Sequence, residues 1–150
     1  MTEIYVDADA CPVKSEVIRV AERHRLRVHI VSNSWMRLDE SDFVNRVVVS
    51  EGSDVADDWI AERAATGDIV ITSDIPLADR CIKRGADVLG PTGKPFTEDS
   101  IGMAMAMREL NAELRDTGVI RGYNAAFGPR DRSNFLNVLE NTVRKALKAG

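Results

Sequence analysis

Cysteine is scarce in this sequence, and its placement excludes two kinds of protein. The chain contains two cysteines, Cys11 and Cys81. They lie far apart and match no metal-ligand spacing such as Cys-x-x-Cys. A disulfide scaffold and a cysteine-based zinc site are therefore excluded, and two reduced thiols of a cytosolic protein are the simpler interpretation.

Long apolar segments and an excess of positive charge are also missing. No apolar run approaches the roughly 20 residues that a membrane span needs, and residues 1–3 lack the basic start and apolar stretch of a signal peptide. We therefore expect a cytoplasmic protein without a membrane partner. The formal net charge is −4, from 24 acidic and 20 basic residues. This balance argues against a protein coated in positive charge for non-specific nucleic-acid binding, but it leaves room for a local basic patch beside an acidic site.

What is present is an alternation of strand and helix patterns. Short apolar runs predict strands at residues 4–6, 28–31, 47–49, 69–71 and 87–89. Apolar residues at helical spacing predict helices at 12–24, 55–64, 76–84, 97 to about 114, and 133–148. Residues 33–45 are polar and irregular, and we expect Trp35 and Phe43 to hold this loop against the protein. Residues 90–95 form a turn-rich linker.

This order of elements predicts an α/β fold. Strands that alternate with helices form a mainly parallel sheet covered on both faces, so we expect a three-layer α/β/α architecture around about five strands. The 150 residues fit one domain, 1–150, with the helices from about residue 97 packed on the same domain. Such sheets bind ligands beyond the carboxyl ends of their strands.

Aspartates follow three of the predicted strands at that edge. They are Asp7 and Asp9 after the first strand, Asp54, Asp57 and Asp58 after the third, and Asp74 after the fourth. Crowded carboxylates repel one another, and Mg²⁺ or Mn²⁺ relieves that repulsion through oxygen ligands. Each single aspartate has a simpler interpretation as a helix cap or a solvated residue. The convergence of three groups nevertheless predicts a divalent-metal site.

Helical spacing leaves the choice within the second group open. Residues three or four positions apart share a helix face, so Asp54 is paired with either Asp57 or Asp58. Two basic residues beside a helix start, Arg130 and Arg132, and Lys94 in the linker are candidates for contacts with the phosphates of a nucleic acid. The Arg-Asp-Arg run at 130–132 is equally consistent with a surface salt-bridge cluster.

Four motifs together resemble the YaiI/YqxD family of bacterial proteins, which has a PIN-like domain. They are YVDADACPV at 5–13, GSDVADDWI at 52–60, ITSDIPLA at 71–78 and DRSNFL at 131–136, in the family's order. The resemblance implies a PIN-like fold with acidic residues at the carboxyl edge of the sheet, and many PIN-like domains are Mg²⁺- or Mn²⁺-dependent nucleases acting on RNA. It assigns metal binding to Asp7, Asp54, Asp57 and Asp74, with Asp9 as a family-specific addition to the catalytic group.

Three functions are compatible with these residues. The favoured one is a metal-dependent phosphodiesterase acting on RNA, in which Asp9 is a further ligand or orients water. The second is a phosphatase of the haloacid dehalogenase type, because residues 7–9 imitate its Asp-x-Asp nucleophile. The third is a catalytically weak RNA-binding or regulatory module with the same fold. The sequence leaves the oligomeric state open.

Overall fold

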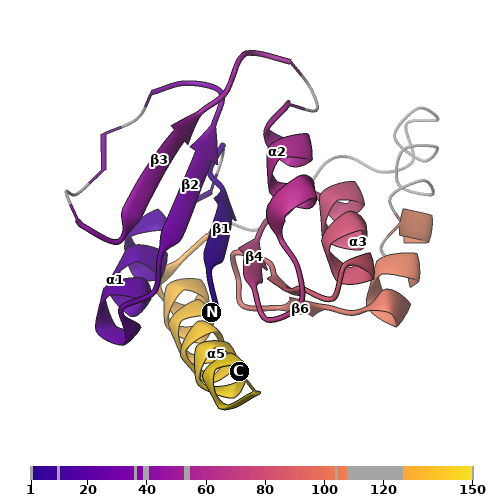
Figure 1. Ribbon diagram of the computed structural model, residues 1–150. Coiled ribbons are helices and arrows are strands. Elements are labelled where there is room, and N and C mark those ends of the chain that lie inside the picture. The colour runs from indigo at the N-terminus through magenta and orange to yellow at the C-terminus, as the bar shows by residue number, and fades with distance from the viewer. Residues whose placement is uncertain are drawn as a thin grey trace.

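The computed structural model describes residues 2–9, 11–35, 37–38, 41–52, 55–103, 105–107 and 127–149. Strands and helices alternate along the chain (Figure 1). The strands are β1 (Ile4–Asp7), β2 (Val28–Ser32), β3 (Val44–Val48), β4 (Ile69–Ile71), β5 (Asp87–Leu89) and β6 (Pro95–Phe96). The helices are α1 (Lys14–His24), α2 (Val55–Arg63), α3 (Ile75–Lys83) and α5 (Pro129–Ala149), and residues 98–103 and 105–107 are also helical.

The strands form one sheet in the order β3-β2-β1-β4-β5-β6. All pairs are parallel except β5 with β6, which is antiparallel. The predicted mainly parallel sheet is confirmed, and within it the first and fourth strands lie side by side. Because β1 pairs with β2 on one side and β4 on the other, the carboxyl ends of these three strands meet at one point of the sheet edge.

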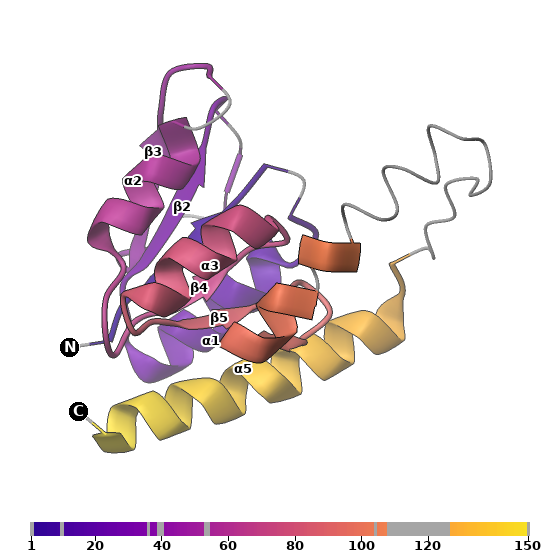
Figure 2. The same cartoon turned by 90° about the vertical axis from the view of Figure 1, so that its right-hand side faces the viewer.

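Helices cover both faces of the sheet, which confirms the three-layer α/β/α fold (Figures 1 and 2). Alternate residues of each strand point to opposite faces. On one face Val6 and Ile71 pack with α1 and α5 around Phe135, which is fully buried. On the other face Tyr5 and Val70 pack with α2 and α3.

The structure differs from the prediction at the third strand and at the linker after the fifth. The strand expected at 47–49 begins at Val44, since β3 lies at the sheet edge and tolerates the polar Asn45 and the exposed Arg46. The linker at 90–95 contributes the start of the sixth strand, β6, which was not predicted because two residues leave no periodic signal. Most of the predicted helix beyond residue 107 lies outside the described residues.

The last helix begins four residues earlier than predicted. Pro129 suits a first helical position because it has no N–H to satisfy. The Asp131 carboxylate accepts a hydrogen bond from the Gly128 N–H at 2.9 Å, as an acidic residue at the third position of a helix does in a capping box. Local capping therefore extends α5 beyond its apolar repeat.

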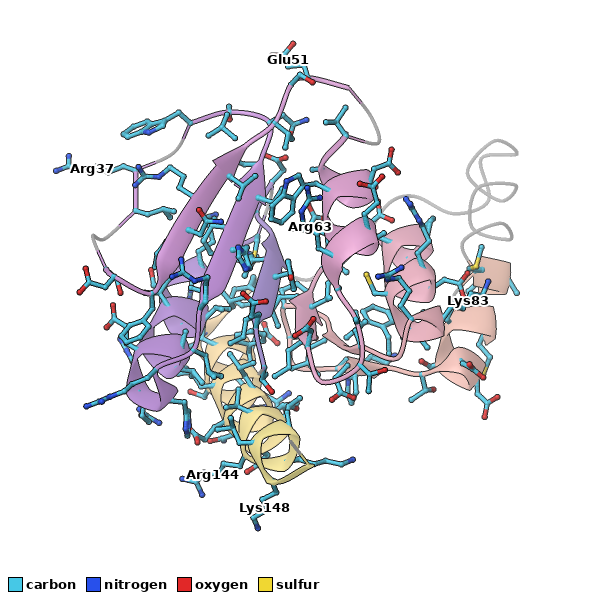
Figure 3. All side chains as sticks on the ribbon, in the orientation of Figure 1. Arg37, Glu51, Arg63, Lys83, Arg144 and Lys148 are labelled. Carbon is cyan, nitrogen blue, oxygen red and sulfur yellow. The ribbon has the colours of Figure 1, made fainter. Side chains whose placement is uncertain are left out.

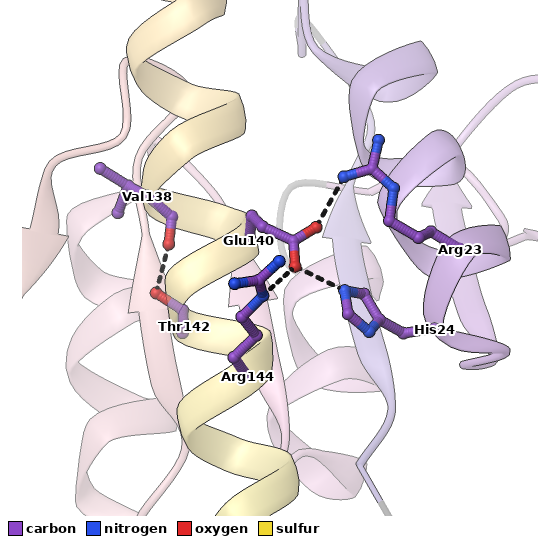
Figure 4. A network of polar contacts seen from close by, with 6 residues as sticks. All are labelled: Arg23, His24, Val138, Glu140, Thr142 and Arg144. Carbon is purple, nitrogen blue, oxygen red and sulfur yellow. Dashed lines mark hydrogen bonds and ion pairs between the residues drawn. The ribbon is translucent and has the colours of Figure 1, made fainter.

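A carboxylate on α5 ties this helix to the end of α1 (Figure 4). Glu140 accepts hydrogen bonds from Arg23 at 2.8 Å and from Arg144 at 2.8 Å, and it lies 2.7 Å from the His24 Nε2. Burial acts to raise the pKa of Glu140, but the hydrogen bonds of His24, Arg144 and Arg23 outweigh burial and hold that pKa below its usual range. The network fixes the C-terminal helix across more than a hundred residues of sequence. None of the helices that the structure describes combines the length and apolar composition needed to cross a membrane.

Candidate metal-binding cleft

A threonine joins two of the predicted aspartates at the carboxyl edge. Asp7 ends β1, and Thr72 follows β4 directly, so the pairing of these strands places them side by side. The Thr72 hydroxyl donates to Asp7 Oδ2 at 2.9 Å and accepts from the Asp74 N–H at 3.0 Å. Thr72 is buried, with 2% of its surface exposed. Its hydroxyl therefore fixes the orientation of the Asp7 carboxylate relative to the backbone that carries Asp74.

Asp74 is the N-cap of α3. Its Oδ1 accepts a hydrogen bond from the Leu77 N–H at 2.9 Å, and its backbone is extended, with φ −82° and ψ 112°. This satisfies one of the N–H groups that a helix start leaves unpaired. The capping interpretation of this aspartate is therefore correct, and it does not exclude ligand binding, because capping uses one of the two carboxylate oxygens.

Asp9 connects the loops after β1 and β2. Its Oδ2 accepts a hydrogen bond from the Asn33 N–H at 3.2 Å. Asn33 had no functional signal in the sequence, since an asparagine after a strand is typical of a turn. The alternative interpretation of Asp9 as a cap of the following helix is not supported, because α1 has no side-chain cap and the Asp9 carboxylate contacts the neighbouring loop.

These residues border a cleft of about 480 Å³ at the carboxyl edge. Asp57 of α2 also lines it, whereas Asp58 points away and forms an ion pair with Arg80 at 2.8 Å. Of the two, Asp57 therefore lines the cleft and Asp58 does not, and the role of Asp57 as a ligand stays a prediction. Asp54 lies outside the described residues. The lining residues are Asp7, Asp9, Asn33, Gly52, Ala56, Asp57, Ser73, Asp74 and Ile75.

The environment of Asp7 disfavours its charged form. Burial raises the pKa of this carboxyl most, and the nearby charges of Asp74 and Asp9 raise it further. The hydrogen bond from Thr72 acts in the opposite direction but does not cancel the rise. A cation beside Asp7 would offset the unfavourable free energy that burial and repulsion impose on the ionised carboxylate. Protonation of Asp7 would relieve it in the same way.

The donor set fits a hard, oxygen-binding cation that keeps part of its water shell. Within the described ranges, which omit Asp54, no group of three His, Cys, Asp or Glu side chains is arranged closely enough to hold a metal ion. Mg²⁺ is usually bound by one or two carboxylates, with water or phosphate oxygens completing its octahedron. Asp7 with Asp74 supplies such a pair, and Asp57 lies across the same cleft.

The predicted phosphate-binding residues do not line the cleft. Arg132 donates to the Pro12 carbonyl at 2.7 Å and to Glu16 at 3.0 Å, which fastens the start of α5 to that of α1. Lys94 and Arg130 are exposed. Their binding to phosphates stays a prediction.

Both cysteines are free and buried, as expected for structural thiols. Burial raises the pKa of Cys11, and it raises the pKa of Cys81 to about 11. Neither thiol is therefore a thiolate nucleophile near neutral pH.

Fold and site together define an α/β/α protein with an acidic cleft at the carboxyl edge of a parallel sheet. The chain belongs to the YaiI/YqxD family: the family described as "Uncharacterized BCR, YaiI/YqxD family" matches residues 5–145. A UPF0178 protein of Parvibaculum lavamentivorans is 64% identical over 144 residues, covering 96% of this chain and 95% of the relative. The UPF0178 protein Atu1478 of Agrobacterium fabrum is 60% identical over 146 residues, covering 97% and 95%. No solved structure shows a significant match to this chain.

Proposed function

We propose that this protein is a divalent-metal-dependent phosphodiesterase of PIN-like type that cleaves nucleic acid, with RNA as the favoured substrate. The observation that carries the proposal is that Asp7, with a raised pKa, and Asp74 both line the cleft, and that the Thr72 hydroxyl links the Asp7 carboxylate to the Asp74 backbone N–H. Structural carboxylates are normally neutralised by a partner, whereas perturbed ones gather at functional sites. The resemblance to PIN-like nucleases agrees with the position of this pair.

Asp7 and Asp74 would hold Mg²⁺ or Mn²⁺, with Asp57 and the undescribed Asp54 as further ligands. A bound divalent ion lowers the pKa of water and neutralises charge on a phosphodiester. The protein side of the chemistry is positioning. Thr72 keeps the Asp7 carboxylate in one orientation, and the Asn33 N–H holds Asp9 at the rim of the cleft. From there Asp9 orients water towards the phosphorus.

Cleavage assays with isosteric variants test the proposal. Labelled single-stranded and structured RNA and DNA are incubated with the protein and Mg²⁺, Mn²⁺ or a chelator. Asp7→Asn and Asp74→Asn keep a side-chain oxygen for Thr72 and Leu77 while removing the charge. Metal-dependent cleavage that both substitutions abolish supports the proposal.

Asp58→Asn is the matched control, because Asp58 is the neighbour of Asp57 in sequence but pairs with Arg80 outside the cleft. It should cleave like the wild type. Cleavage that survives the Asp7→Asn and Asp74→Asn substitutions would come from a contaminant or another site and would count against the proposal.

The second candidate is a catalytically weak RNA-binding module. Over the ranges that the structure describes, no complete three-residue metal group is assembled. RNA binding without cleavage in any metal would support this candidate. The phosphatase alternative gains support only from the shared position of Asp7 and Asp9 at the cleft, and it requires an acid-stable phosphoenzyme.

A further inference from the structure

Trp35 is exposed next to the cleft, contrary to the expectation that it packs down the loop. Its exposed fraction is 66%. It follows the cleft-lining Asn33 by two residues, which places its Cα within about 7 Å of the Asn33 Cα. The Arg46 guanidinium of β3 lies over the Trp35 ring, 5.1 Å from its centroid. An exposed indole with a cation on one face presents its remaining surface to solvent.

The same segment continues into a second pocket of about 280 Å³ that carries positive charge. Arg37 and Lys14 line it from the loop and from the start of α1. The Lys14 ammonium is held at the carboxyl edge by the Cys11 carbonyl, at 2.7 Å. Figure 3 shows Arg37 at the side of the molecule outward from the edge strand β3, away from Arg144 and Lys148.

Arg46, Arg37 and Lys14 form no ion pair with any carboxylate in the part of the chain that the structure describes. A polyanion would otherwise be repelled by the aspartates of the cleft, in a chain whose net charge is −4. Basic residues on the segment that follows the cleft-lining Asn33 would offset this repulsion locally.

We propose that a strand-entry patch binds a single strand of nucleic acid and directs it into the acidic cleft. The patch consists of Trp35, Arg46, Arg37 and Lys14. The Trp35 ring stacks on an unpaired base, and the three cations contact backbone phosphates. Aromatic rings on a positive surface are the usual means of binding single strands, because every base has a π-face. A base inside a duplex has both faces covered by its neighbours, so the patch selects unpaired segments. This inference rests on the proposed function and names its substrate class.

Binding is measured without catalysis, in chelator, so that its outcome does not depend on cleavage. The protein has two tryptophans, Trp35 and Trp59. The Trp59→Phe variant makes Trp35 the sole indole, and its emission is followed during titration with a single-stranded 12-mer of uridine. Parallel titrations use the thymidine 12-mer and an RNA duplex. We expect quenching by the single strands and little change with the duplex.

Affinity is measured by anisotropy of the labelled 12-mers. Trp35→Ala should weaken binding by roughly 5- to 150-fold, the range of one lost base stack, and Trp35→Phe should recover most of it. The control Met103→Ala removes another exposed apolar side chain, 71% exposed, and should bind like the wild type. Equal loss in both alanine variants would overturn the stacking role of Trp35.

Salt dependence tests the cations. Arg37→Gln and Arg46→Gln should each lower the slope of log affinity against log salt by about 0.7, the value for one phosphate contact on a single strand. Lys148→Gln, away from this side of the molecule, should leave the slope unchanged. Equal slopes in all three variants would overturn the phosphate contacts.

The outcomes separate this inference from the proposed function. Trp35-dependent binding in chelator, without cleavage in Mg²⁺ or Mn²⁺, supports the strand-entry patch and refutes the nuclease. Cleavage that Trp35→Ala leaves unchanged, or binding of the duplex as tight as that of the single strand, refutes the patch and spares the nuclease.

Discussion

Replacing Asp74 by alanine and by asparagine separates the two functions assigned to this side chain. One carboxylate oxygen caps α3 through the Leu77 N–H, and the carboxylate charge faces the cleft beside Asp7. Alanine removes both the cap and the charge. Asparagine removes the charge alone, because its side-chain oxygen accepts the same hydrogen bond.

The structure sets the size of each effect on stability. Replacement of an N-cap residue by alanine costs about 1 kcal/mol of unfolding free energy. Leu77 is 1% exposed, so water does not readily replace Asp74 as the hydrogen-bond acceptor of the Leu77 N–H. In a chain of 150 residues this corresponds to a fall in melting temperature of about 2–4 °C. Asparagine keeps the cap and removes one of the charges that raise the pKa of Asp7. Asp74→Asn should therefore be as stable as the wild type or slightly more stable.

Urea and thermal unfolding, followed by circular dichroism at pH 7 in chelator, measure these differences. Metal binding and cleavage should be lost in both variants, although only alanine unfolds earlier. If Asp74→Asn destabilises the protein as much as Asp74→Ala, the cap is not the source of the stability. If Asp74→Asn retains full cleavage, the carboxylate charge has no catalytic part and the reasoning on the cleft is wrong.

Three further predictions concern pH, backbone and the C-terminal helix. The raised pKa of Asp7 means that the folded protein binds this proton more tightly than the unfolded chain, so ionised Asp7 opposes folding increasingly as pH rises through that pKa. Asp7→Asn should then unfold at a higher temperature than the wild type at pH 7 in chelator, and the gain should shrink towards pH 4 in a series of melting curves. Gly93→Ala should lower the unfolding free energy by about 1–3 kcal/mol in urea titrations, because Gly93 has φ +89° and a Cβ there would approach α5 to 3.0 Å. Gly102 lies in a helix with open space around it and serves as the control. Gly102→Ala should raise the unfolding free energy by about 0.4–1 kcal/mol. Glu140→Gln should lower the unfolding free energy by about 1 kcal/mol at pH 7. Because the pKa of Glu140 is lowered in the folded protein, thermal melts should show this difference vanishing as pH falls through that pKa. A difference that persists at about pH 3 would contradict the charge-based account.

The periodicity of short segments predicted most of the fold. Apolar triplets such as that at 69–71 are fully buried strands in the structure, because a strand buried on both faces has no polar side to present. The edge strand β3 was only partly recognised, since its residues alternate between half-buried and exposed. The pair β5–β6 was missed because an antiparallel partner of two residues depends on contacts with β5 rather than on its own sequence.

The predicted aspartates Asp7, Asp9 and Asp74 lie at the expected edge of the sheet, whereas the orientation of side chains within a group could not be predicted. The rule that ligands lie beyond the carboxyl ends of parallel strands placed Asp7, Asp9 and Asp74 at one edge, and all three line the cleft. The rule could not separate Asp57 from Asp58, because both follow the start of the same helix. Arg80 of α3, which lies beside α2, draws Asp58 out of the cleft.

The sequence by itself determined the period of each element, the family and the edge at which acidic residues collect, because these depend on neighbours along the chain. Tertiary structure alone decided which side chains meet. Thr72 contacts Asp7 across 65 positions of sequence, and Glu140 contacts His24 across 116. Trp35 is 66% exposed and contacts Arg46 through its ring, although an aromatic residue in a loop suggested a buried anchor. Contacts between distant segments depend on how the layers pack, so the residue pattern within one segment does not predict them.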